Sequence, residues 1–138
     1  MPALVDGSYV RTLGGLPDEI SDERLLPHIE SAERLVWNYT GFSPSGYATL
    51  GENVQARLRE AVGCFAISYA LPVLNTFYLD SADRVPRDVA ETSGYLFHDA
   101  ADVARLARMW EQRGYEALRG IRSGGVVTAT VIEEVGWR

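Results

Sequence analysis

The sequence predicts a mainly α fold, a small helical bundle with a long surface loop (80–97) and an extended C-terminal tail. Residues 21–40 and 99–121 place apolar side chains at steps of three and four, which is the period of one helix face. Between them, residues 61–79 carry no charge, as expected of a helix that is covered on several sides. Residues 126–138 are rich in β-branched side chains and read as an extended segment.

The first 20 residues contain glycine and proline and follow no clear period, so we expect an N-terminal arm with turns at residues 14–15 and 17–18. A helix should follow, with Ser21 as its N-cap and Gly41 at its C-terminal end. Pro27 either kinks this helix or starts it afresh. Its buried face should be the apolar stripe Leu25, Ile29, Ala32, Val36 and Tyr39.

Residues 41–48 are expected to form a loop. Thr49 and Glu52 have the spacing of a capping box, which predicts that the second helix begins there. This should be the longest helix; it should contain residues 54–71, with Phe65 and Ile67 among its buried positions. Pro72 should kink it, because proline removes a backbone donor and clashes with the preceding turn.

Residues 80–97 have mixed charge and no period, and so long a loop in a small domain usually has a function or is disordered. Asp99 and Asp102 resemble a capping box at the start of the next helix. We expect Gly114 to interrupt that helix, and Gly120 or the glycines at 124–125 to end it. Its apolar side should comprise Val103, Leu106, Trp110, Ala117, Leu118 and Ile121.

The C-terminal segment divides the chain into a helical domain (1–125, including the arm 1–20) and a docking tail (126–138). The tail is apolar on both faces of an extended strand, which a small helical domain can hardly cover alone. It is therefore a candidate for docking on another subunit or protein, although pairing with residues 84–97 is an equally good alternative. The candidate partner-interface residues are Val127, Val131, Ile132, Val135, Trp137 and Arg138.

Composition narrows the function. The net charge is −6 and no basic run occurs, which disfavours nucleic-acid binding as the main task. The uncharged run 61–79 nearly has the length of a membrane span, but it contains Ser68, Tyr69, Asn75 and Thr76, so a buried helix is favoured. The N-terminal residues have no basic region and no long apolar core, so we do not expect a signal peptide.

No catalytic constellation stands out. His28 and His98 lie far apart, and neither has a partner at the spacing of a metal site. Cys64 lies in the most apolar stretch, where a thiolate is costly and a nucleophilic role is disfavoured. The sequence therefore predicts a protein that is not an enzyme, with no catalytic, cofactor-binding or metal site and no cofactor, whose function lies in its surfaces.

The order of three segments suggests a family. These are SDERLLPHIESAERLVWNYTG (21–41), VQARLREAVGCFAISYAL (54–71) and YEALRGIRSGG (115–125). Together they resemble the head–tail connector, or adaptor, proteins of tailed bacteriophages and related gene-transfer particles. The resemblance covers residues 21–79 and 103–125 and consists mainly of apolar positions.

The resemblance implies a helical subunit that assembles into a homo-oligomeric ring, typically twelvefold, at the neck of the virion below the portal protein. Such a ring extends the channel through which double-stranded DNA passes without specific binding, and it docks a tail-side stopper or tail-completion protein. An acidic balance would suit a channel that must not retain phosphates. Two alternatives remain: a cellular interaction module, such as a regulator or antitoxin-like partner, and a small enzyme with an inter-subunit site.

Overall fold

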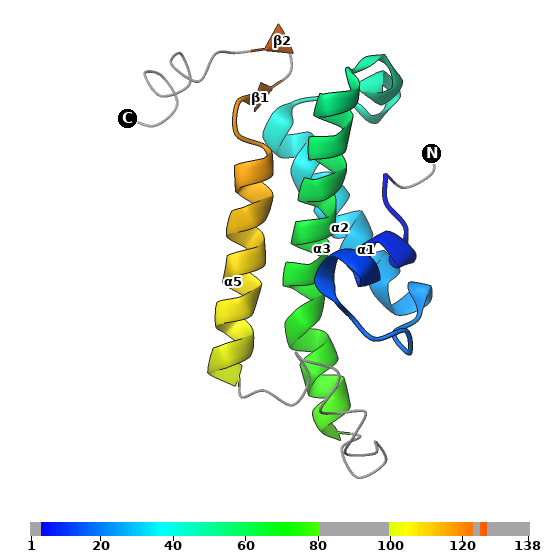
Figure 1. Cartoon of the computed structure of the whole chain (residues 1–138), viewed down its shortest axis with the longest axis vertical. Coiled ribbons are helices and arrows are strands. Elements are labelled where there is room, and N and C mark those ends of the chain that lie inside the picture. The colour runs from blue at the N-terminus through cyan, green and yellow to red at the C-terminus, as the bar shows by residue number, and fades with distance from the viewer. Residues whose placement is uncertain (1–3, 81–99, 123–124, 127–138) are drawn as a thin grey trace.

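The mainly α prediction is confirmed. The computed structural model describes residues 4–80, 100–122 and 125–126 (Figure 1). Of the expected loop (80–97), Asp80 belongs to a helix and residues 81–97 lie outside the described residues, as do residues 127–138 of the expected tail. The described elements are α1 (Gly7–Gly14), α2 (Asp22–Thr40), the 3₁₀ helix η1 (Pro44–Thr49), α3 (Glu52–Asp80), α5 (Ala100–Ala117), and the strands β1 (Ile121–Arg122) and β2 (Gly125–Val126).

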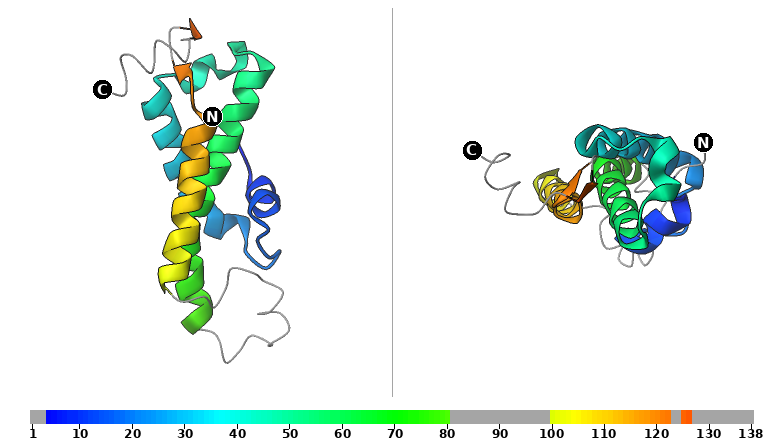
Figure 2. Two further views of the ribbon diagram at one scale, coloured as in Figure 1. Left: turned by 60° about the vertical axis from the view of Figure 1, so that its left-hand side comes forward. Right: turned by 90° about the horizontal axis from the view of Figure 1, so that it is seen from above.

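Helix α3 is the centre of the bundle. Helix α5 runs along one side of it, whereas α1 and the N-terminal part of α2 lie on the other (Figures 1 and 2). Every residue from 61 to 68 is buried, which explains why this stretch carries no charge. Phe65 and Ile67 are fully buried, so the prediction for the longest helix is confirmed. Helix α3 continues through Pro72 to Asp80.

Helix α2 follows its predicted limits. The Ser21 hydroxyl accepts a hydrogen bond from the Arg24 amide at 3.3 Å, and Gly41 ends the helix with a φ of 78°. Of the two alternatives for Pro27, the structure has one helix that runs through it. The predicted stripe is buried at Leu25, Ile29, Ala32 and Val36, whereas Tyr39 is half-buried.

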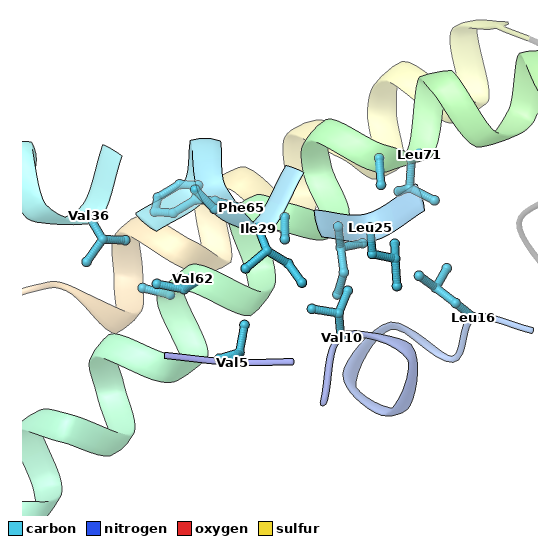
Figure 3. Close-up of a cluster of buried hydrophobic side chains, with 14 of the residues drawn as sticks. Val5, Val10, Leu16, Leu25, Ile29, Val36, Val62, Phe65 and Leu71 are labelled. Atoms are coloured by element: carbon cyan, nitrogen blue, oxygen red, sulfur yellow. The ribbon is translucent and has the colours of Figure 1, made fainter. Parts of the chain in front are cut away.

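The expected N-terminal arm is wrong. Residues 7–14 form a helix whose N-cap, Asp6, accepts a hydrogen bond from the Tyr9 amide at 2.8 Å. The helix and the turn after it place their apolar side chains against α2 and α3. Burial of these side chains holds the segment in the core. Figure 3 shows part of this cluster; the buried hydrophobic side chains of the segment are Val5, Val10, Leu16 and Ile20.

Two polar contacts fasten this segment to α2. The Arg11 guanidinium donates to the Asp22 carboxylate at 2.6 Å and to the Ile20 carbonyl at 3.0 Å. The Leu4 amide donates to the Glu33 carboxylate at 2.8 Å. The expected turn at residues 14–15 is present, with Gly15 at a φ of 64°. The N-terminal 20 residues therefore belong to the helical body as far as the structure describes them.

The predicted capping box at Thr49 is not formed. Residues 44–49 wind into η1, and the Thr49 hydroxyl donates back to the Gly46 carbonyl at 2.7 Å. Helix α3 therefore begins at Glu52, three residues later than expected. The physical reason is local: Pro44 is pre-set for the first position of a helical turn, so the short 3₁₀ segment forms where a loop was expected.

Gly114 does not interrupt α5, contrary to our expectation. A Cβ atom at this position would lie 2.9 Å from the Phe65 ring, so the glycine allows α5 to approach α3 closely. Helix α5 ends at Ala117, and Gly120 follows with a φ of 81°. On its predicted apolar side Val103, Leu118 and Ile121 are buried, while Leu106, Trp110 and Ala117 are partly buried. Asp99, the other residue of the expected capping box, lies outside the described residues.

Candidate interaction surfaces

An open groove of about 490 Å³ lies between the C-terminal end of α2 and the C-terminal half of α5. Helix α2 contributes one wall residue and α5 with its last turn contributes the others. The volume is within the range of ligand-sized pockets and can hold a small number of side chains. Its lining residues are Tyr39, Gln112, Tyr115, Glu116 and Arg119.

Aromatic rings form the apolar part of the groove. The Tyr115 ring centroid lies 5.3 Å from that of Tyr39 and 5.0 Å from that of Phe65, with an edge-on arrangement to Phe65. Because Gly114 brings α5 close to Phe65, Tyr115 rests on the core with one side while 37% of it remains exposed. Burial, followed by the nearby Glu111 and Tyr39, raises the pKa of Tyr115, so its phenol is neutral at physiological pH.

The rim of the groove is polar and carries both signs of charge. Gln112, Glu116 and Arg119 are exposed, and the side chains of Glu116 and Arg119 form no ion pair within the described residues. The Arg57 guanidinium of α3 donates to the carbonyl of Ala117 at 2.9 Å and also to that of Arg119. This contact fixes the last turn of α5, and so the groove, on the helical body.

Charge is distributed unevenly between the two segments that pack on α3, residues 4–40 (the negative side) and residues 100–122 (the positive side), although the C-terminal end of α2 reaches α5 at the groove. Residues 4–40 carry three arginines and seven carboxylates, a net charge of −4, whereas residues 100–122 carry five arginines and three carboxylates, a net charge of +2. Several of these groups are exposed, including Asp18, Glu19 and Glu23 on one side and Arg108 on the other. Figure 2 shows that α1 and the start of α2 lie on the side of α3 that faces away from α5.

The hairpin after α5 lies next to the groove. Gly120 turns the chain, and Ile121 in β1 pairs with Val126 in β2. Val126, which we expected to begin a tail without an internal partner, therefore pairs with β1 of its own chain. Residues 84–97, the alternative pairing partner, lie outside the described residues. The predicted interface residues Val127, Val131, Ile132, Val135, Trp137 and Arg138 all lie outside the described residues.

The titratable residues singled out by the sequence do not form a site within the described ranges. Burial raises the pKa of the Cys64 thiol to about 11, so a thiolate is disfavoured at neutral pH. Burial also lowers the pKa of His28, and His98 lies outside the described residues. Among residues 4–80, 100–122 and 125–126, no group of three or more His, Cys, Asp or Glu side chains is placed to hold a metal ion.

The same ranges contain no helix with the length and apolarity needed to cross a membrane. Comparisons of this chain with protein-family models, with curated proteins and with solved structures find no match. The likeness to head–tail connectors therefore depends on the residues quoted above alone.

Sequence reasoning did not identify the groove. Its wall joins Tyr39 and Tyr115, which are 76 positions apart, and no local period reveals such a contact. One signal was available in retrospect. Tyr115 is a large aromatic residue beside Gly114 and outside the predicted apolar stripe of α5. A glycine in the middle of a helix indicates that another helix approaches closely there. An aromatic residue next to it, outside the apolar stripe, is then placed at the edge of that contact.

Proposed function

We propose that this chain is a structural subunit that joins identical copies into a ring and acts as a head–tail connector at the neck of a virion. In this role the ring sits below a portal protein, extends the DNA channel and docks a tail-side stopper or completion protein. The chain itself performs no chemistry, and it works through its surfaces.

The uneven charge of the two sides of α3 carries this proposal. A negative side formed by residues 4–40 and a positive side formed by residues 100–122 can attract each other between copies. Because the two surfaces differ, each copy uses both at once, and the contact is head to tail. Contacts of this type generate rings when the rotation between copies closes. The resemblance to connectors points to the same architecture.

The groove gives such a subunit a second attachment point. Aromatic walls with a polar rim are typical of the anchoring pockets in protein interfaces, where a few large side chains provide most of the affinity. The net charge of −6 also suits a channel through which DNA passes, because an acidic lining repels phosphates.

Mass photometry and negative-stain microscopy of the purified chain test the proposal, first alone and then mixed with a candidate portal protein. We expect closed rings whose formation weakens as salt rises, since the attraction between the two sides is electrostatic. Arg108→Glu, an exposed change on the positive side, should weaken assembly without altering the helical circular-dichroism signal. A chain that stays monomeric alone and with the portal would refute the connector role.

A further inference from the structure

We infer that the groove between α2 and α5 of one copy holds the C-terminal tail of a neighbouring copy, with Trp137 seated against Tyr39 and Tyr115 and with Arg138 paired with Glu116. This inference rests on the proposed ring and names the contact that links its subunits. It commits the groove to one occupant, residues 127–138 of a second molecule of this chain.

The chemistry of the groove fits that occupant. The Tyr39 and Tyr115 rings, 5.3 Å apart, offer an apolar wall that is only partly covered by the chain itself. Tryptophan is among the residues most often found as an interface anchor, because it buries a large rigid surface for little loss of entropy. Of the three tryptophans of the sequence, Trp37 is in α2 and Trp110 is in α5, whereas Trp137 belongs to the C-terminal segment.

The charges of groove and tail are complementary. Glu116 and Arg119 stand on the rim without an ion pair inside the described part of the chain. The tail carries Glu133 and Glu134 four and three positions before Trp137, and Arg138 directly after it. A tryptophan in the groove therefore brings Arg138 beside one rim charge and the glutamates toward the other, so that opposite charges meet on both sides of the anchor.

The length of the tail favours a neighbour over the same molecule. Only Gly120 separates the groove residue Arg119 from β1, and Val126 pairs with Ile121, so residue 127 follows on from a strand beside its own groove. From Val126 to Trp137 an extended chain spans ~35 Å. Residues 127–132 are apolar or β-branched on both faces, which favours a strand that runs outward between subunits over one that folds straight back.

A charge-reversal experiment on the full chain tests the contact. Glu116→Arg and Arg138→Glu should each weaken self-association by about tenfold or more, as measured by sedimentation and mass photometry. The two changes in one chain should restore it. Trp137→Ala, which removes the anchor, should weaken it about 30-fold. Glu111→Arg is the matched control, because it reverses an exposed charge on the same helix without lining the groove. It adds to the positive side that attracts the neighbouring copy, so it should not weaken assembly.

Mixing the two single variants separates a contact between copies from one within a copy. A Glu116→Arg chain and an Arg138→Glu chain repel their own kind at the groove, but each offers the other an opposite charge. We expect the mixture to assemble in alternation although neither variant assembles well alone. If the tail folded into its own groove, mixing would change nothing, and the inference would be wrong.

The remaining outcomes distinguish this inference from the proposed function. Rings that form equally well with every charge reversal and with Trp137→Ala would overturn the tail contact and leave the ring intact. Open chains or pairs that depend on Glu116 and Arg138 but never close would support the tail contact and contradict the connector role. A chain that remains monomeric at every concentration would overturn both.

Discussion

Helices α2 and α5 both pack along α3, yet the two sides of the bundle differ. On the α2 side the N-terminal segment adds a further layer, and five residues of α2 are buried. On the other side, α5 and the turn after it bury Val103, Gly114 and Leu118, while Met109 is 60% exposed and Tyr115 is 37% exposed. The difference teaches that α2 is covered by a further layer of the same chain, although Leu26 stays 48% exposed, whereas α5 has no such layer within the described residues and keeps Met109 and Tyr115 at a surface that a partner can cover.

The largest loss of stability on this flank is expected at Phe65, because this side chain lies between α3 and α5 and is fully buried. Phe65→Ala should lower the free energy of unfolding by about 3–5 kcal/mol, since the removed ring leaves a cavity between α3 and α5. Met109→Ala, on the exposed face of α5, is the control and should change stability by less than about 0.5 kcal/mol. Urea denaturation of the two variants measures both values, and similar losses would mean that the outer face of α5 is not free.

The helices of the bundle differ in how well they could be predicted from the sequence. Helix α2 could be predicted from Ser21 to Gly41, because its cap, stripe and C-terminal glycine are local signals that agree with one another. Helix α1 could not, since a helix of eight residues is marginal by itself and forms here through its contacts with α2 and α3. Thr49 has the right spacing for a helix cap, but its hydroxyl donates to the Gly46 carbonyl in the preceding turn.

The candidate site was harder to predict than the fold. From the sequence alone, Gly114 resembles a helix breaker. The position of the Phe65 ring shows instead that this glycine allows α5 to pack closely on α3. The groove is lined by Tyr39 of α2 and by residues of α5 and the turn after it, so it depends on the relative placement of segments that are distant in sequence. The predicted docking residues are a hypothesis about the tail that the described residues do not test.

Arg57 tests how the C-terminal end of α5 is held on α3, on the flank that has no second layer within the described residues. Arg57→Met keeps most of the aliphatic side chain but removes the donors to the Ala117 and Arg119 carbonyls, and we expect a loss of about 2 kcal/mol. Arg108→Met is the control, because Arg108 is exposed on the same side and should contribute little. Thermal melts followed by circular dichroism compare the two. Equal melting temperatures would show that the end of α5 does not depend on Arg57.

Gly114 tests the spacing between α3 and α5. In Gly114→Ala the new methyl group would lie 2.9 Å from the Phe65 ring, and such overpacking costs about 1–3 kcal/mol. The better helix propensity of alanine offsets up to about 1 kcal/mol, so the expected net loss is about 1 kcal/mol. Gly51→Ala is the matched control because a Cβ atom there meets nothing within 4 Å. A stabilised Gly114→Ala variant in urea denaturation would contradict the close approach.

Cys64 tests whether the centre of α3 stays shielded from water by α5. Its thiol has a pKa of about 11 in the folded chain, raised from 9.0 chiefly by burial. Below pH 9 the thiol is protonated in both states and its contribution to stability is complete. As the pH rises from 9 to 11 the unfolded chain loses this proton first, so that contribution is lost. Between pH 8 and pH 10 the wild type should therefore lose about 1 kcal/mol more than Cys64→Ala.

The difference between wild type and Cys64→Ala is the quantity to measure, because Tyr9, Tyr69 and Tyr115 also have raised pKa values and titrate in alkali in both proteins. Urea denaturation at both pH values provides it. A thiol reagent adds a kinetic test at pH 8. If α5 stays on α3 in the native state, Cys64 reacts only as fast as the whole chain unfolds. Reaction well ahead of global unfolding would show that α5 opens locally, and the flank would then be loosely held as well as incompletely covered.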